Sequence, residues 1–215
     1  MNFSLVNKTV CLCAKKNSGK SQLLRYLILL QRPLFKTIYC ICPTEEINGF
    51  YGDIIKRENI FPKYSEEWVE KLMTKMATIN ANKSDEEASH ILLILDDVCS
   101  DINFHQSPTF KKLFTRGRHL KIAIIITAQY RYHIPPICRS NLDFILCSQL
   151  NRQGIEILTS EYLMGDITKQ EFIKMYHQNT TNYGFFLINN NCATDNCNLD
   201  EIYGSIRTPK NFIKK

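Results

Sequence analysis

The sequence AKKNSGKS occupies residues 14–21 and lies between an apolar run, Thr9–Cys13, and a helical pattern over Lys20–Gln31. A strand, a polar loop ending in Gly-Lys-Ser and a helix match the phosphate-loop pattern G-x-x-x-x-G-K-[ST] at every defined position but the first, where Ala14 replaces glycine. Such a loop curls backbone N–H groups around a phosphate at a helix N-terminus. The stretch therefore predicts a nucleotide-binding domain of the α/β class.

The residue types of this loop have distinct expected roles. Gly19 permits the tight backbone turn, Lys20 is expected to reach the β- and γ-phosphates, and Ser21 is expected to give a hydroxyl to Mg²⁺. Alanine is the smallest replacement for glycine, so the loop is expected to close. We expect ATP to contact the whole stretch and the residue after it: Ala14, Lys15, Lys16, Asn17, Ser18, Gly19, Lys20, Ser21 and Gln22.

A pair of aspartates, Asp96 and Asp97, ends the apolar run His90–Leu95. In a parallel sheet the carboxyl ends of the strands form the ligand-binding edge. Asp96 is therefore expected to hold Mg²⁺, directly or through water. Asp97 is expected to lie near the γ-phosphate and to orient and polarise the attacking water.

A glutamine, Gln129, follows the next apolar run, Ile122–Thr127. Its side-chain amide is expected to act as a sensor that contacts the γ-phosphate or the attacking water. This role requires the strand at 122–127 to lie between the phosphate-loop strand and the aspartate strand. A polar cap on the strand is the alternative.

Two arginines flank that strand in the sequence. Arg118 precedes it, so we expect Arg118 at the sheet edge opposite its own phosphate loop, where it is better placed to reach the nucleotide of a neighbouring subunit. Arg139 precedes the following strand and is the other candidate for this catalytic role. For each of them a surface or structural ion pair is the alternative.

Strand-like runs alternate with helical patterns along the chain, which predicts a mostly parallel sheet with helices on both faces. Residues 1–190 are expected to form one ATPase domain, and 191–215, rich in Asn and Asp, an irregular tail. The expected strands are 9–13, 35–42, 90–95, 122–127, 142–147 and 183–188, and the expected helices are 20–31, 65–80, 108–114, 154–159 and 169–176.

Composition narrows the class of protein. The N-terminus has no basic segment ahead of a long apolar one, and the apolar runs are much shorter than the roughly 18–20 residues of a membrane span. We therefore expect neither a secretory signal nor a membrane span. Most of the nine cysteines lie in apolar segments and are expected to be reduced thiols; Cys192 and Cys197 alone would make only half of a zinc site.

The net charge of +6 is unevenly distributed along the sequence. No acidic residue lies between Asp101 and Asp143, whereas the rest of the chain has 20 basic and 21 acidic residues. The segment therefore carries the whole positive excess, around Gln129, where a neighbour's nucleotide or DNA would use it. Its seven basic residues are Lys111, Lys112, Arg116, Arg118, Lys121, Arg131 and Arg139.

Together these motifs resemble the DNA-packaging ATPases of large DNA viruses, the poxvirus-like branch of the FtsK–HerA superfamily. The similar segments lie within residues 8–150: HILLILDDV at 90–98, GRHL at 117–120, QYRYHIP at 129–135 and RSN at 139–141. The resemblance implies a RecA-like P-loop fold of the ASCE type. It also implies an ATP-driven ring of identical subunits that pumps double-stranded DNA into a preformed capsid.

The resemblance also implies roles for individual residues and a set of partners. Lys20 and Ser21 become the phosphate and Mg²⁺ residues, Asp96 and Asp97 the metal-binding and water-activating acids, and Gln129 the sensor. Arg118 and Arg139 recur in the family pattern. The implied partners are double-stranded DNA, bound without regard to sequence, and capsid or vertex proteins. The implied location is the site of virus assembly in the host cytoplasm, or the virion.

Other function classes stay open at this point. A small P-loop nucleotide kinase would suit the length but would need an arginine-rich lid and an acceptor pocket. A nucleotide-binding scaffold without hydrolysis conflicts with the presence of Lys20, Asp96 and Asp97. A cellular or plasmid DNA translocase of the same superfamily is the remaining alternative, although such proteins usually carry further domains.

Overall fold

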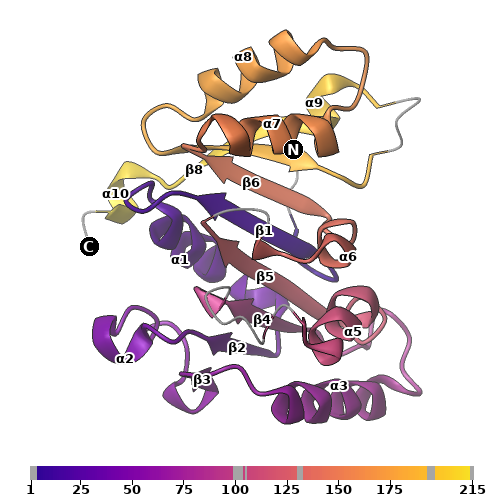
Figure 1. Ribbon diagram of the computed structural model, residues 1–215. Helices are drawn as coiled ribbons and strands as arrows, with labels where there is room; N and C mark the ends of the chain where they lie inside the picture. The colour runs from indigo at the N-terminus through magenta and orange to yellow at the C-terminus, as the bar shows by residue number, and fades with distance from the viewer. Residues whose placement is uncertain (1–3, 99–103, 105, 130–132, 193–196, 214–215) are drawn as a thin grey trace.

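The computed structural model describes residues 4–98, 104, 106–129, 133–192 and 197–213 (Figure 1). Its sheet has eight strands in the order β3-β2-β4-β5-β1-β6-β7-β8. The first six strands of that order run parallel, β7 is antiparallel to β6, and β8 is antiparallel to β7. The strands are β1 Thr9–Ala14, β2 Thr37–Ile41, β3 Ile60–Phe61, β4 Ile91–Leu95, β5 Ile122–Ala128, β6 Phe144–Ser148, β7 Gly184–Asn189 and β8 Tyr203–Arg207.

Helices cover both faces of this sheet, as the sequence predicts. The helices are α1 Lys20–Gln31, α2 Glu45–Asn48, α3 Glu66–Asn80, α5 Pro108–Arg116, α6 Pro136–Arg139, α7 Arg152–Tyr162, α8 Lys169–Asn179, α9 Leu199–Ile202 and α10 Lys210–Ile213, with 3-10 turns η1 Arg32–Leu34 and η2 Arg57–Asn59. The helix that follows the phosphate loop begins and ends where its pattern predicts. Ser65 caps α3 by accepting a hydrogen bond from the Trp68 backbone N–H at 3.2 Å.

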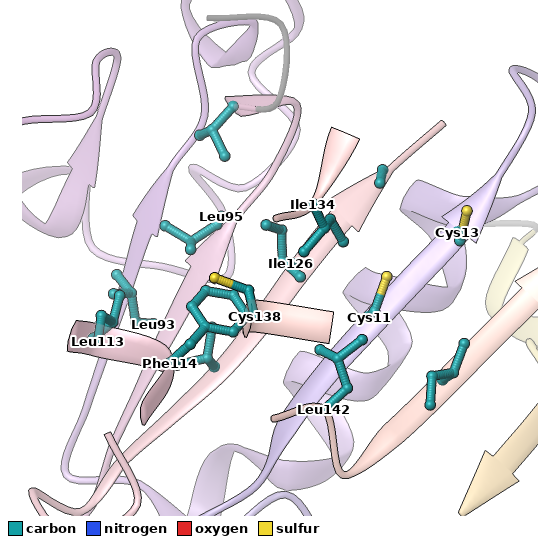
Figure 2. Close-up of a cluster of buried hydrophobic side chains, with 14 of the residues drawn as sticks. Cys11, Cys13, Leu93, Leu95, Leu113, Phe114, Ile126, Ile134, Cys138 and Leu142 are labelled. Carbon is teal, nitrogen blue, oxygen red and sulfur yellow. The ribbon is translucent and has the colours of Figure 1, made fainter. Parts of the chain in front are cut away.

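The side chains of successive residues in the central strands pack alternately in two separate hydrophobic cores, one on each face of the sheet. Leu12 packs in the core beneath α1, whereas Cys11 and Cys13 pack with α3, α5, α7 and α8 on the other face. Figure 2 shows this second core, where Cys11 and Cys13 lie across from Leu95 and Ile126. Burial on both faces explains why β1, β4, β5 and β6 have almost uninterrupted apolar sequences.

The strand order confirms the arrangement that the role of Gln129 requires. β5 lies between β1 and β4, with Cys13 opposite Ala128 and Leu95 opposite Ile126. The register therefore carries the ends of β1, β4 and β5 to one edge of the sheet. Neighbouring strands are about 4.8 Å apart, so the residues after β4 and β1 lie about 10 Å from each other.

The expectation of an irregular segment after residue 190 is wrong. β8 pairs with β7, and its Tyr203 is opposite Ile188. α9 and α10 flank this strand. The strand escapes prediction because it lies at the sheet edge, where only Tyr203 is buried and Gly204, Ser205 and Arg207 break the apolar pattern. The two-residue β3 at the other edge is too short to leave a pattern.

Candidate functional site

The phosphate loop joins β1 to α1 and turns at two residues. Asn17 and Gly19 have φ values of 62° and 86°, in the left-handed region. Asparagine tolerates this region and glycine favours it. Ala14 is the last residue of β1 and is buried, in extended backbone that any residue can adopt. The loop therefore does not need the conformational freedom of glycine at position 14, which explains the departure from the usual pattern.

The N-terminus of α1 has the properties of an anion site. Gly19 provides no side-chain cap, and the first turn contains no acidic residue. The first backbone N–H groups of a helix lack partners within the helix, and the helix dipole is positive at that end. Within the part of the chain that the structure describes, the buried Ser18 hydroxyl also has no hydrogen-bond partner. A buried polar group without a partner is costly, so a phosphate oxygen fits this loop.

The side chains of the loop differ in exposure. Lys15, Lys16 and Asn17 are exposed, whereas Lys20, Ser21 and Gln22 at the start of α1 are half-buried. The half-buried cation and hydroxyl thus lie at the helix end where phosphate is expected, and the exposed lysines lie outside it. The structure brings all nine predicted nucleotide residues into one loop and helix start.

Asp96 is held from two sides at the carboxyl end of β4. Thr127 Oγ1 donates a hydrogen bond to Asp96 Oδ1 at 2.6 Å, and the Tyr51 hydroxyl donates to Oδ2 at 2.7 Å. The Cys42 thiol lies 3.7 Å from Oδ2. These contacts fix the carboxylate, and Oδ1, which accepts from Thr127 alone among them, keeps a second lone pair for a metal-bound water.

The neighbours of Asp96 stay uncharged at neutral pH. Burial, with the charge of Asp96 added to it, raises the pKa of Tyr51 well above its ordinary value. Burial likewise raises the pKa of Cys42 to about 11. Both groups therefore keep their protons and act as donors to the carboxylate. Oxygen ligands of this kind, the carboxylate of Asp96 and the hydroxyl of Ser21, suit Mg²⁺.

Thr127 links the two aspartates. Its Oγ1 donates to Asp96 and accepts a hydrogen bond from the backbone N–H of Asp97 at 3.1 Å. Asp97 has a φ of 56°, a left-handed conformation that is uncommon for a residue other than glycine. Sparsely populated backbone conformations of this kind persist where the surrounding contacts impose them. The hydroxyl of Thr127 thus sets the turn that separates Asp97 from its neighbour.

Replacement of Thr127 by valine tests this link. Valine has nearly the same shape but lacks the hydroxyl, so Asp96 loses a donor and the Asp97 N–H loses its acceptor. We expect the free energy of unfolding to fall by about 1–3 kcal/mol, as measured by urea denaturation, and ATP hydrolysis to slow. Thr127→Ser keeps the hydroxyl and should preserve hydrolysis. Unchanged stability and activity in Thr127→Val would show that the link has no role.

Gln129 follows β5 directly at the same sheet edge. The Cys13 thiol lies 3.9 Å from the carbonyl oxygen of Gln129 and donates to it. This contact holds the end of β5 beside the end of β1, and the Gln129 side chain is half-buried. The residue therefore stands between the phosphate loop and the aspartate pair, which is the position its sensor role requires.

The two arginines are engaged at the opposite edge of the sheet. Arg118 pairs with the buried Asp143, which also accepts from the Thr9 backbone N–H at 2.7 Å and lies 3.5 Å from the Lys8 ammonium. Arg139 pairs with Glu161 at 3.0 Å. The Arg118 side chain is 57% exposed and that of Arg139 only 20%. Arg118 is therefore the more accessible of the two to a neighbouring subunit.

In the folded chain, the positive charge of the segment between Asp101 and Asp143 is partly neutralised by ion pairs. Four of its cations form ion pairs with acids from outside it, and Arg131 lies outside the described residues. The expectation of a concentrated positive surface is thus wrong for these four, because the folded chain brings distant carboxylates to them. The pairs are Lys112–Glu70, Arg118–Asp143, Lys121–Asp85 and Arg139–Glu161.

Sequence reasoning missed three residues of this site. Thr127 left a signal, since it is the polar residue in an otherwise apolar strand. Tyr51 and Cys42 left none, because their contacts with Asp96 span 45 and 54 residues of sequence. Such contacts depend on the packing of β2 and the following loop against β4.

Comparisons with known proteins place the chain in a viral group. The family model described as "Poxvirus A32 protein" matches residues 3–199. Protein 075L of Invertebrate iridescent virus 6 is 32% identical over 197 residues, which cover 91% of this chain and 75% of that protein. Protein 015R of Frog virus 3 is 25% identical over 182 residues, which cover 85% of this chain and 56% of that protein. The chain thus spans little more than half of the Frog virus 3 relative.

Solved structures share the fold. The genome packaging NTPase B204 from Sulfolobus turreted icosahedral virus 2, in complex with AMPPCP, superposes with a TM-score of 0.63 at 17% identity and covers 95% of this chain and 98% of that one. The pCW3 conjugation coupling protein TcpA superposes with a TM-score of 0.55 at 15% identity, covering 72% of this chain and 53% of that one. The predicted P-loop ATPase fold is confirmed.

The resemblance drawn from the motifs is confirmed as well. The family match spans the phosphate loop, the aspartate pair, Gln129 and both arginines. In the described residues no helix has the length and apolar character needed to cross a bilayer. The chain belongs to the Poxvirus A32 protein family.

Proposed function

We propose that this chain is an ATP-hydrolysing motor that translocates double-stranded DNA and packages a viral genome into a preformed capsid. The observation that carries the proposal is that the phosphate loop and the Asp96–Thr127–Asp97 link lie at the same edge of the sheet, in a chain of the A32 family. The fold shared with a viral genome packaging NTPase supports the same assignment.

Nucleotide binding falls to the phosphate loop. The N–H groups at the start of α1 and the unpartnered Ser18 hydroxyl donate to phosphate oxygens. Lys20 places its ammonium near the β- and γ-phosphates and offsets the charge that develops there during transfer. Gly19 lets the backbone approach the phosphates closely.

Mg²⁺ would be held by Ser21 and Asp96, and when bound it neutralises charge on the β- and γ-phosphates. Hydrogen bonds from Thr127 and Tyr51 fix the orientation of the Asp96 carboxylate for this role. Because Tyr51 and Cys42 keep their protons, Asp96 is the group among these three that is available to hold the metal.

Hydrolysis needs a base that orients water toward the γ-phosphate. Asp97 follows the metal-binding residue and has a left-handed backbone conformation, with a φ of 56°. Its carboxylate accepts a hydrogen bond from the attacking water and polarises it. Gln129, on the neighbouring strand, contacts the γ-phosphate or the same water and reports whether ATP is intact.

The product of the reaction distinguishes this function from that of a nucleotide kinase. Purified protein is incubated with MgATP, with and without nucleoside monophosphates, and the products are separated by chromatography. The proposal predicts ADP and inorganic phosphate in both samples. Formation of nucleoside diphosphate from the monophosphate, without release of phosphate, would assign the chain to the kinases instead.

The partners follow from the family. We propose that subunits assemble into a ring, grip double-stranded DNA through its phosphates without reading its sequence, and dock on capsid or vertex proteins. The work takes place where virions assemble in the host cytoplasm, or in the virion. In such a ring each nucleotide lies at an interface, so a neighbouring subunit can supply an arginine to it.

We propose Arg118 for that role, because it lies at the opposite edge from its own loop and is more exposed than Arg139. If Arg118 left Asp143 to reach a neighbour, the Asp143 carboxylate would keep its contacts with Thr9 and Lys8.

Mixed assemblies test whether Arg118 acts between subunits. Arg118→Ala should lower turnover by about 10³-fold, while Asp97→Asn should stop hydrolysis in its own site. Mixing the two variants pairs an intact Asp97 with a neighbour's intact Arg118, so we expect activity to return. Activity that stays at the sum of the separate variants would contradict the role. Arg139→Ala is the control, and is expected to lower stability through loss of its ion pair with Glu161 without such recovery.

A further inference from the structure

An exposed tyrosine stands against the phosphate loop. Tyr183 lies in the turn between α8 and β7 and is 57% exposed. A Cβ atom placed on Gly19 would lie 3.3 Å from Cδ1 of the Tyr183 ring. The ring is therefore a direct neighbour of the residue that precedes α1, although the two are far apart in the sequence.

The turn that carries this ring is fixed by hydrogen bonds. The backbone N–H of Gly184 and the guanidinium of Arg207 each donate to the carbonyl oxygen of Thr181 at 2.9 Å. The Ser148 hydroxyl donates to the carbonyl oxygen of Gly184 at 2.7 Å. Ser148 pairs in register with Ala14, where the phosphate loop begins. These contacts hold the turn at the sheet edge that carries the loop, and Figure 1 shows the chain passing from α8 to β7 there.

The backbone of the turn is unfavourable for a large side chain. Asn182 and Tyr183 have φ values of 49° and 59°. Turns with two successive left-handed residues favour glycine, asparagine and aspartate, so tyrosine is the unexpected residue here. Its ring is not used to fill the core either, since more than half of the residue is exposed. An unfavourable conformation that holds an aromatic ring outward beside a binding loop indicates a ligand.

The strand order decides which part of a nucleotide meets this ring. Asp97 and Gln129 follow β4 and β5, on one side of β1. The Tyr183 turn joins β7, on the other side of β1 beyond β6. Because the γ-phosphate must face the aspartate that activates water, the nucleoside end of the molecule is directed toward β6 and β7. The base thus extends toward the side of the loop where the ring stands.

We propose that Tyr183 is the residue on which the base of the bound nucleotide stacks, while the loop at 14–21 holds the phosphates. The inference rests on the proposed function and adds a base subsite to it. Stacking on an aromatic ring uses the π-face that every base has, so this contact gives affinity with little selection among bases. The hydroxyl of Tyr183 is not needed for it.

Titration calorimetry on the full chain separates the base from the phosphates. MgATP and magnesium tripolyphosphate are the two ligands, and Tyr183→Gly and Tyr183→Phe are the variants. Glycine removes the ring and suits the left-handed backbone, so the turn should stay folded, whereas phenylalanine keeps the ring. We expect Tyr183→Gly to raise the Kd for ATP about 5- to 150-fold and to leave the Kd for tripolyphosphate unchanged. Tyr183→Phe should leave both unchanged.

Two results would overturn this subsite while the proposed function stands. One is an ATP affinity that Tyr183→Gly does not change. The other is an equal loss of ATP and tripolyphosphate affinity, which would assign the ring to support of the phosphate loop. If the unmodified protein bound neither ligand, the proposed function itself would fail, and the base subsite with it.

Discussion

Replacement of Lys20 by alanine is expected to remove ATP turnover almost completely. The residue opens α1 directly after the loop and is half-buried at the helix end where the phosphates are expected. A preorganised cation at a transferring phosphoryl group acts in a partly water-excluded site, and loss of such a contact lowers turnover by roughly 10²–10³-fold. ATP affinity should fall as well, because the ground-state phosphates lose the same charge. Phosphate release and calorimetric titration measure the two effects.

Lys16→Ala is the matched control for Lys20→Ala. Lys16 belongs to the same loop and carries the same charge, but it is exposed. Its loss should change turnover only slightly, since an exposed charge is screened by solvent. Equal effects of the two substitutions would mean that general positive charge, rather than the position of Lys20, governs binding.

Replacement of Asp97 by asparagine is expected to separate binding from hydrolysis. Asparagine has the size of aspartate and tolerates the left-handed backbone observed at this position. The amide cannot accept a proton from water, so the rate should fall by about 10²–10⁴-fold, the usual contribution of a general base. ATP should still bind, because the loop at 14–21 is intact. Single-turnover hydrolysis and calorimetry on the same sample check both statements.

Asp166→Asn is the control for Asp97→Asn. Asp166 is exposed and lies between α7 and α8, away from the aspartate pair. The Asp166→Asn variant should hydrolyse ATP at the rate of the unmodified protein. An Asp97→Asn variant that kept its hydrolysis rate would show that another group activates the water. A variant that lost ATP binding would show that Asp97 supports the loop instead.

The sequence predicts those parts of the site that local patterns encode. A loop between a strand and a helix is read from residues 14–21, and two acids after an apolar strand mark its carboxyl end. The position of Gln129 follows from both, since parallel strands end at one edge. The strand order confirms this arrangement, because β5 lies between β4 and β1.

Contacts between distant segments were beyond such prediction. Tyr51 reaches Asp96, and Tyr183 reaches Gly19, only because β2 and β7 pack into the same sheet as β1 and β4. The ion pair between Arg118 and Asp143 likewise joins the segment before β5 to the start of β6. Each of these depends on tertiary packing, which leaves no periodic pattern along the chain.

The steady-state rate of ATP hydrolysis with and without duplex DNA tests the central claim most directly. The purified chain is assayed with MgATP alone, with linear duplex DNA of mixed sequence, and with the same DNA at raised salt, and Asp97→Asn serves as the blank. The account predicts that DNA of any sequence increases phosphate release, that salt weakens the increase as phosphate contacts are screened, and that the blank shows none of it. Hydrolysis that duplex DNA leaves unchanged would contradict the assignment as a DNA motor.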